Sequence, residues 1–455
     1  MKSFKYPRGP IWLSLFMENK GQMVGSPNWY QKNFKKYGDS FSLQIGFNEK
    51  AIFTQDEEFV EYILKKNPAN YKKSKHSTHH FRKFMGLSII NTFGQEWTNH
   101  KRSIQSSFHL NKIKSLYVSQ KQSIDAFLKN LPTGRAIDIY PFLQQMTLNV
   151  LTNCLLSTSL KSANLSVINQ HLTEILDYLV IDIRTPLTAW WRQINGQEKK
   201  IQLKVNKIKD IIGEIIDIRL KNKEHHFDLI DLLLSTNNTK RGWLLNREKI
   251  INEILALLFL GSKSSANALS WTLHLLARHP KETRNLRART KNFTVEECVL
   301  SPQILATLKE SMRLFPPVWI IERTALKDDS FKSFSFQKGT LISLFIYGLH
   351  HNKKLWKKPE SFIPERFLQD QNKETIRKAY YPFGAGPRGC MGYHFALSEM
   401  AIFLHTFIHQ FDIKASFLFP EMVPQVTLRP DKVILHIKRK WHDQQKEPYF
   451  NQLAI

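Results

Sequence analysis

The spacing of apolar residues divides the chain into a mixed beginning, a long helical middle and an irregular end. Between about residue 94 and residue 316, apolar positions recur every three or four residues, which is typical of helices with one buried face. The clearest runs are residues 172–183, 201–220 and 250–276, and each is broken by Pro, Gly or a polar cluster. A further helix is expected over residues 391–410. The pattern therefore predicts a mainly α-helical protein.

Short strand-like runs lie near both ends of the chain. They cover residues 41–45, 51–54, 341–346, 426–428 and 433–437. The dipeptide Pro430-Asp431 predicts a turn that joins the last two runs into a hairpin. Because strands and helices do not alternate, the pattern excludes a doubly wound parallel sheet. We expect a mainly α fold with small β-sheets.

The chain is strongly basic. Its 66 Lys and Arg residues exceed its 39 Asp and Glu residues and give a net charge of +27. Such a charge favours an acidic partner, which leaves a redox protein, an anionic membrane face, an anionic substrate or nucleic acid. A solvated basic surface explains it equally well. No nucleic-acid recognition motif accompanies the charge, so we do not expect nucleic acid as a partner. The lysine clusters lie at residues 72–75, 199–209, 353–358 and 438–440.

Cysteine usage and the N-terminus bear on location. The three cysteines, Cys154, Cys298 and Cys390, are far apart and lack zinc-ligand spacing, which indicates a reducing compartment and predicts a cytoplasmic protein. The apolar patch at residues 11–16 is too short for a signal core or a spanning helix. We therefore expect no transmembrane anchor. Trp190-Trp191, beside the basic 199–209 segment, leaves peripheral membrane contact open.

The most informative motif is a glycine-rich run that ends at a cysteine. It reads Phe383-Gly384-Ala385-Gly386-Pro387-Arg388-Gly389-Cys390-Met391-Gly392. Glycine permits close backbone approach to a flat ligand. Cys390 opens a predicted helix, whose N-terminus favours thiolate over thiol and whose free N–H groups can bond the sulfur. Arg388 can reach an acidic group on the same ligand. The alternative is a glycine loop with a buried structural cysteine.

Three further motifs carry charged residues in a fixed order. Glu310 and Arg313 lie on one helix face and can pair, and a Pro-Pro dipeptide ends that helix. Arg366 lies in the Pro-rich segment 359–367. The third motif begins at Trp97 and continues through His100, Lys101 and Arg102. Taken one at a time, these residues would be surface charges.

Together, the four motifs resemble the cytochrome P-450 superfamily, whose haem-binding pattern FxxGxRxCxG is matched at every fixed position. The resemblance implies one haem domain over residues 1–455, with a β-rich part at about 1–95, a helical part at about 96–316 and a β/loop part at about 317–455. It implies a triangular helical prism around haem b, with Cys390 as the iron ligand. The expected cofactor-binding residues are Phe383, Gly384, Gly386, Arg388, Gly392, Trp97, His100, Arg323 and either Lys101 or Arg102. The resemblance also implies that Glu310, Arg313 and Arg366 form a buried structural network.

The central helix departs from the family pattern at the residues expected to be catalytic. Where the family reads (Ala/Gly)-Gly-x-(Asp/Glu)-Thr, this chain reads Leu260-Gly261-Ser262-Lys263-Ser264. Gly261 costs a helix about 1 kcal/mol relative to alanine, and we expect its reason to be room for a small ligand. Ser264 keeps a hydroxyl group, while Lys263 replaces the acid. One hypothesis turns Lys263 to another face and delivers protons through Ser264 and water. The other invokes altered oxygen chemistry, with peroxide as the oxidant.

The resemblance also suggests a substrate pocket and a reaction. The expected pocket residues are Phe84, Met85, Ile89, Leu257, Leu260, Val318, Trp319 and Ile320, which suit a largely apolar small molecule. We expect a monooxygenase supplied with electrons by a separate acidic ferredoxin or flavodoxin and its reductase. The alternatives are a peroxide-dependent peroxygenase or peroxide isomerase, and a non-catalytic haem- or ligand-binding protein.

Overall fold

The protein is described by a computed structural model. The structure describes residues 4–10, 26–45, 49–105, 108–156, 162–184, 189–222, 228–235 and 246–440. The apolar patch at residues 11–16 lies outside these residues. Within the described part, no helix is both long and apolar enough to cross a membrane.

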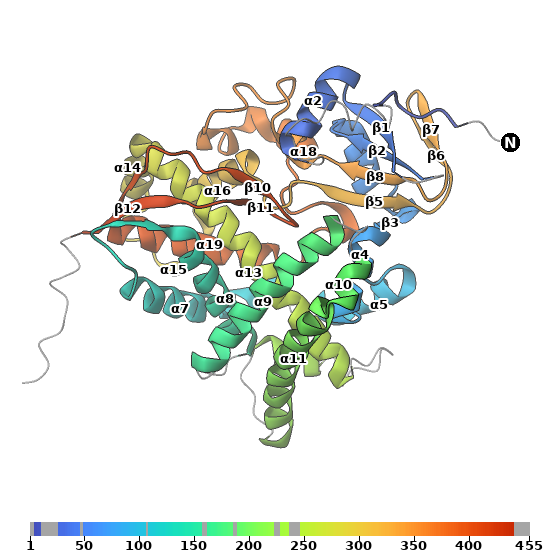
Figure 1. The fold of residues 1–455 in the computed structure, drawn as a ribbon. Coiled ribbons are helices and arrows are strands. Elements are labelled where there is room, and N and C mark those ends of the chain that lie inside the picture. Colours follow the sequence, from blue (N-terminus) through green and yellow to red (C-terminus); the bar gives the residue numbers. More distant parts are fainter. Residues whose placement is uncertain are drawn as a thin grey trace, which may run out of the picture.

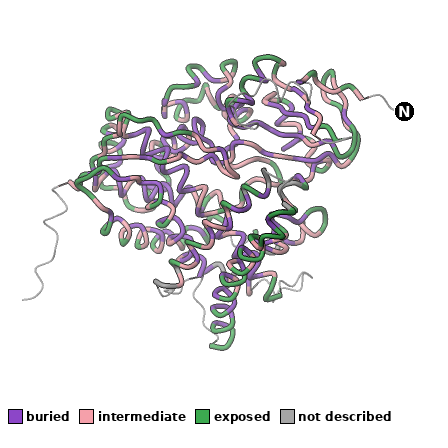
Figure 2. Tube along the Cα trace, viewed as in Figure 1, coloured by how far each residue is buried: buried purple, intermediate pink, exposed green. Residues whose placement is uncertain are grey.

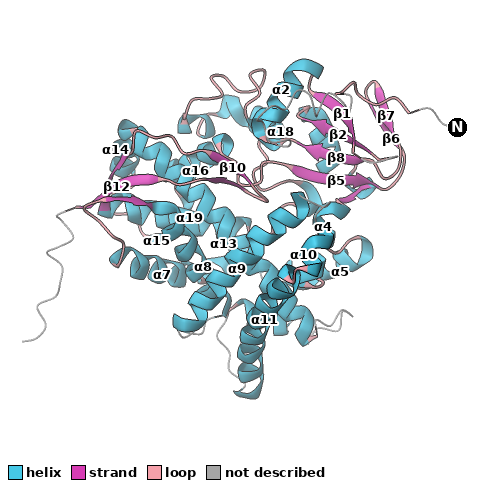
Figure 3. Ribbon diagram, in the orientation of Figure 1, coloured by secondary structure: helices cyan, strands magenta, loops and turns pink. Residues whose placement is uncertain are grey.

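Helices make up most of the molecule and gather around one long central helix, α13, while the largest sheet lies at one end (Figures 1 and 3). The helices of the described residues are α2 (Pro27–Tyr37), α3 (Glu57–Glu61), α4 (Lys75–Met85), α5 (Gly94–Gln105), α6 (Leu110–Ser115), α7 (Tyr117–Lys129), α8 (Ile139–Leu156), α9 (Ser162–Arg184), α10 (Ala189–Ile194), α11 (Gln197–Asn222), α12 (Leu229–Ser235), α13 (Arg247–Arg278), α14 (Pro280–Arg289), α15 (Val295–Leu300), α16 (Pro302–Leu314), α17 (Ile346–His350), α18 (Lys373–Ala379) and α19 (Tyr393–Gln410). Short 3-10 or π turns that concern the site are η1 (Tyr62–Lys66), η6 (Pro364–Phe367) and η8 (Gly386–Arg388). The expected helical middle and the late helix are therefore confirmed.

Helix α13 is buried along most of its length, as Figure 2 shows. The Asn246 side chain accepts a hydrogen bond from the Lys249 N–H and caps its start, and the helix ends before Pro280. Its sequence is apolar on several faces, which is typical of a helix that passes through a core. The helices around α13 therefore pack against one buried central helix.

Strands from both ends of the chain join in one sheet. Its order is β1-β2-β8-β5-β3, formed by β1 (Ser40–Gln44), β2 (Lys50–Thr54), β8 (Leu341–Leu344), β5 (Ile321–Ala325) and β3 (Tyr71–Lys73). Strands β2 and β8 run parallel, and the other neighbours run antiparallel. A small hairpin pairs β6 (Asp329–Phe331) with β7 (Phe334–Phe336). The strands expected near residues 41–54 and 341–346 are confirmed, although the latter ends at Leu344 and α17 follows.

The predicted hairpin across Pro430-Asp431 is wrong. Strand β11 (Leu428–Pro430) pairs with β10 (Met422–Pro424), whereas β12 (Ile434–Arg439) joins a different sheet between β4 (Ala136–Asp138) and β9 (Phe411–Ala415). The Asp138 carboxylate accepts a hydrogen bond from the Val433 N–H, which positions the chain directly before β12. The partners lie far away in sequence, so local turn chemistry did not reveal them.

A buried ion network ties α16 to η6. Glu310 and Arg313 are fully buried, and their side chains form two hydrogen bonds of 2.8 and 2.9 Å. Arg366 Nε lies 3.1 Å from Glu310 Oε1, and the Ile363 N–H donates to the same oxygen. Both carboxylate oxygens thus have charged partners, as a buried carboxylate requires.

We expect Glu310→Gln to lower the free energy of unfolding by about 3–5 kcal/mol, because it leaves two buried guanidinium groups without a charged partner. Chemical denaturation measures the effect. Glu374→Gln, which breaks an exposed pair with Lys378, serves as the control and leaves the midpoint unchanged. Equal stability of the two variants would contradict the prediction.

Candidate functional site

The cysteine loop owes its shape to two glycines with left-handed backbone conformations. Gly384 and Gly386 have φ angles of 68° and 65°. A Cβ atom on Gly386 would collide with the Leu64 carbonyl oxygen of η1, so only glycine fits there. The Cys390 N–H donates to the Phe383 carbonyl oxygen at 2.9 Å and closes the loop. The loop is therefore pressed against η1 and held in one conformation.

The Cys390 thiol lies deep in the protein and yet is accessible. Its side chain is exposed, while burial raises the pKa of the thiol. Both observations fit a group that lines an accessible interior surface. A hydrogen bond from the Gly392 N–H and the charge of Lys73 act to lower the pKa, but burial outweighs them. Gly392 is the N-cap residue of α19, so its bond acts in the direction expected of a helix N-terminus. The expected thiolate stays a prediction.

Three cations cluster near this thiol, one of them buried and two half-buried. Lys73 of β3 and Arg323 of β5 are paired in register, and Arg388 lies in the cysteine loop. Burial lowers the pKa of Lys73 to about 7, and it lowers the pKa of Arg323 and of Arg388 to about 10. Among the described residues, none of the three has a carboxylate within 4.0 Å, and Arg388 Nη1 has no hydrogen-bond partner. The cluster is therefore built for an anionic ligand.

Sequence reasoning missed Lys73 as a site residue. It lies inside the basic segment 72–75, which the sequence alone suggests to be part of a solvated basic surface. Side chains alternate along a strand, so Tyr71 and Lys73 share one face of β3. The aromatic residue Tyr71, which is buried in the structure, was the one sequence signal that Lys73 also faces inward.

Helix α5 brings an aromatic ring and one cation to the same place. The Arg388 guanidinium lies 3.8 Å from the centre of the Trp97 ring. Lys101 lies 5.2 Å from that ring and donates to the Pro387 carbonyl oxygen at 2.9 Å. Arg102 is exposed, and His100 is buried with its Nε2 atom 3.1 Å from Glu253 of α13. Of the two open candidates, Lys101 is therefore the cation that contacts the cysteine loop.

One stretch of α13 is also accessible. Leu260 is 36% exposed in an otherwise buried helix, and Leu257 and Ser264 are half-buried on the same face. The Ser264 hydroxyl donates to the Leu260 carbonyl oxygen at 2.8 Å. A Cβ on Gly261 would lie 2.9 Å from a side-chain carbon of Leu151, so the missing side chain lets α13 and α8 pack closely. The expected room for a small ligand stays a prediction.

Lys263 borders this accessible stretch, and its side chain reaches toward α9. Its Nζ atom donates to the Thr173 hydroxyl at 3.3 Å. Burial lowers the pKa of Lys263 to about 8, and the nearby Arg429 lowers it further, whereas Asp177 raises it. Lys263 and Ser264 are thus adjacent in sequence but face different elements.

The expected pocket residues do not all meet. Ile89, Val318 and Ile320 are half-buried, whereas Phe84 and Met85 are buried, with Phe84 packed edge-on against Tyr178. Trp319 is a correction. It packs with Tyr30 and Phe345 in an aromatic cluster beside the large sheet, and its ring nitrogen donates to the Gln425 carbonyl oxygen. Ile320 packs against this same cluster, whereas Val318 packs against the second cluster around the large sheet.

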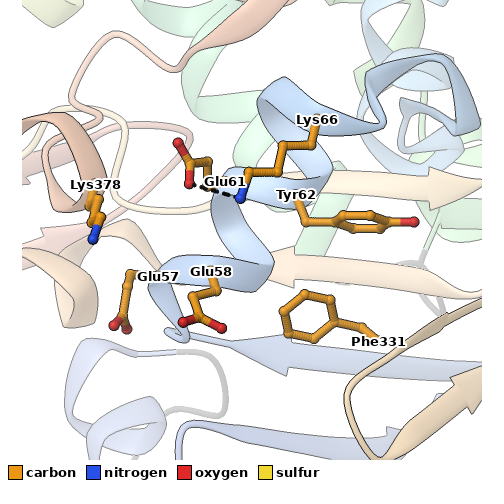
Figure 4. Close-up of a pocket in the computed structure, with 7 residues that line it drawn as sticks. All are labelled: Glu57, Glu58, Glu61, Tyr62, Lys66, Phe331 and Lys378. Carbon is orange, nitrogen blue, oxygen red and sulfur yellow. Dashed lines mark ion pairs between the residues drawn. The ribbon is translucent and has the colours of Figure 1, made fainter.

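A separate surface pocket contains no expected site residue. It has a volume of about 230 Å³ and is lined by Glu57, Glu58, Glu61, Tyr62, Lys66, Phe331 and Lys378 (Figure 4). Glu61 and Lys66 form an ion pair within it, and Glu58 pairs with Lys332. Paired charges on an open surface are common, so this pocket carries no functional argument.

Comparison with known proteins identifies the family. A cytochrome P450 family model matches residues 6–438, so the chain belongs to the cytochrome P450 family. The crystal structure of the cytochrome P450DA haem domain superimposes with a TM-score of 0.85 at 20% identity, covering 96% of this chain and 98% of that chain. The expected mainly α fold is confirmed.

The similar curated proteins come from distant organisms. Cyclooctat-9-en-7-ol 5-monooxygenase of Streptomyces melanosporofaciens is 26% identical over 84% of this chain and 83% of its own length. A putative cytochrome P450 132 of Mycobacterium bovis is 26% identical over 84% and 86%. Human cytochrome P450 4F11 is 26% identical over 87% and 81%. The chain is accordingly a monooxygenase of the oxidoreductase class, with haem b as its cofactor.

The residues on the interior surface fit haem b. The Cys390 sulfur is accessible and can bind iron, and the glycines before it allow close approach of a flat ring. The cations without carboxylate partners, Lys73, Arg323 and Arg388, suit the two acidic groups of haem. Trp97 and Lys101 support Arg388 from α5.

We expect Lys101→Met to speed loss of haem to an acceptor protein roughly tenfold, because it removes a cation beside the cysteine loop. Arg102→Met is the matched control and leaves the rate unchanged, since Arg102 is exposed. The rate is followed by the shift in haem absorbance on transfer. A larger effect of Arg102→Met would reverse our assignment of the two cations.

Proposed function

We propose that this chain inserts one oxygen atom from O₂ into a small, largely apolar organic substrate, with electrons from a separate redox partner. The accessible Cys390 thiol carries this proposal, together with three nearby cations that have no carboxylate partner among the described residues. When bound, haem b supplies the iron at which oxygen is activated. The thiolate of Cys390 donates electron density to that iron and favours O–O cleavage.

The residues of α13 supply protons and positioning in this proposal. Ser264 Oγ carries a proton at the accessible face and now donates it to the Leu260 carbonyl oxygen. A hydroxyl group both donates and accepts, so it can exchange this bond for one with water. Lys263 Nζ donates to Thr173 of α9, which favours proton delivery through Ser264 and water over delivery by Lys263. Leu257 and Leu260 present apolar surface to the substrate.

An acidic ferredoxin or flavodoxin, with its reductase, is the electron donor we propose. Exposed Lys66 and Arg102 lie on elements that contact the cysteine loop, η1 and α5. With a net charge of +27, the chain attracts acidic proteins over a distance set by ionic strength. We expect the reduction rate to fall with added salt.

Peroxide use is the second candidate, and the replacement of the usual acid by Lys263 is the observation that favours it.

The location of the protein is indicated by its free thiols. Those of Cys154 and Cys298 support a reducing, cytoplasmic setting. Trp190 and Trp191 of α10 are 60% and 55% exposed, which supports peripheral contact with a membrane surface.

The dithionite-reduced protein should show a strongly red-shifted Soret band with carbon monoxide, because the Cys390 thiolate would bind the haem iron. Cys390→Ala should lose this band. Cys298→Ala keeps it, since Cys298 is buried and donates to the Ala401 carbonyl oxygen. A band typical of histidine ligation in the unaltered protein would refute thiolate ligation.

With an electron donor and NADPH, Ser264→Ala should release several times more hydrogen peroxide per NADPH oxidised, because the proton at Ser264 Oγ is lost. Ser270→Ala on the same helix is the control. Its hydroxyl is buried and donates to the Ala266 carbonyl oxygen, so the ratio stays unchanged. Product formed with hydrogen peroxide but never with NADPH and a reductase would instead support the peroxygenase.

A further inference from the structure

Lys263 lies in the one accessible stretch of the central helix. Between residues 250 and 276, α13 is buried except at Leu257, Leu260, Gly261, Lys263 and Ser264. Leu257, Leu260 and Ser264 form the accessible face described above, and Lys263 borders it. The ammonium group therefore stands at the edge of the surface that receives the substrate in the proposed function.

The hydrogen bonding of Lys263 is incomplete. An ammonium group has three N–H donors, and the structure gives it one partner, the Thr173 hydroxyl at 3.3 Å. Among the described residues, no carboxylate lies within 4.0 Å of Nζ. Asp177, one turn further along α9, acts on Lys263 through its charge but is exposed and does not reach it. A half-buried cation with one neutral acceptor lacks the charged partner that such groups normally have.

The surroundings add a second positive charge. Arg429 of β11 also acts on Lys263, and it lies 5.7 Å from the Tyr140 ring of α8. Backbone carbonyl oxygens of Pro430 and Asp431 accept hydrogen bonds from Arg429, and they carry no net charge. Two cations therefore face one exposed carboxylate. One further anion would balance the cluster.

We infer that the substrate is an apolar molecule that carries a carboxylate, and that Lys263 Nζ binds this carboxylate while Leu257 and Leu260 contact the apolar part. One carboxylate supplies two acceptors for the two remaining N–H donors of Lys263 and one negative charge. The inference rests on the proposed function, because it names the substrate class of that site. It also gives the replacement of an acid by lysine a role in recognition.

The test compares a carboxylic acid with the alcohol of the same length. Calorimetry on the haem-loaded protein measures binding of dodecanoate and of 1-dodecanol at pH 7. We expect the unaltered protein to prefer dodecanoate roughly 10- to 100-fold, the factor that a charge-assisted hydrogen bond provides. Lys263→Met should remove this preference and leave dodecanol binding unchanged. Lys309→Met on α16, which replaces another lysine whose pKa burial lowers, should keep it.

Three results would overturn the inference: equal binding of acid and alcohol by the unaltered protein, no binding of either, or an intact preference in Lys263→Met. The carbon monoxide spectrum of the same samples separates this test from the proposed function. A normal thiolate spectrum without acid preference refutes the inference alone. An acid preference measured without a thiolate spectrum refutes the proposed function alone.

The pH dependence gives a second readout. The charged groups that face Lys263 are Asp177 of α9 and Arg429 of β11, and Tyr140 of α8 stays neutral because burial raises its pKa. The protonated amine is the form that binds, and burial lowers its pKa to about 8. Affinity for dodecanoate should therefore fall above about pH 8, by roughly tenfold per pH unit. Affinity for dodecanol should not change. Dodecanoate binding that stays constant to pH 10 would contradict the role of Lys263.

Discussion

The clustering of three cations near one thiol is the constraint on which the rest of the structure depends. Lys73, Arg323 and Arg388 come from β3, β5 and the cysteine loop, and in the described part of the chain no carboxylate lies close enough to pair with them. Burying such charges is costly without an anion, and proximity to each other raises the cost. An acidic cofactor supplies the missing charge, so its binding and the stability of this region are linked. The sheet that joins both ends of the chain serves to hold these cations in place.

Along the central helix α13, some residues serve packing and others serve the proposed chemistry. Gly261 faces Leu151 and lets α8 pack closely, whereas Leu260 and Ser264 face the interior surface. Lys263 lies beside Leu260 and reaches toward Thr173 of α9. A helix with 3.6 residues per turn places four consecutive side chains in four directions, so neighbours in sequence can serve packing, recognition and proton transfer separately.

The sequence by itself determined the features that depend on local spacing. Helical periodicity was sufficient for α13 and α19, because apolar positions every three or four residues specify one buried face. The pairing of Glu310 with Arg313 followed from their spacing on one helix. Two glycines of the cysteine loop needed left-handed conformations, which no other residue adopts so readily. Each of these is set within a few residues of the chain.

Only the tertiary structure decided the features that depend on which distant segments meet. Lys73 looked like surface charge until β3 paired with β5 and buried it beside Arg323. The choice between Lys101 and Arg102 depended on which side of α5 faces the cysteine loop. The strands after Pro430 separated because β4 and β9 offered partners far away in sequence. Local patterns state which face of an element is buried, but its partners follow from packing of the whole chain.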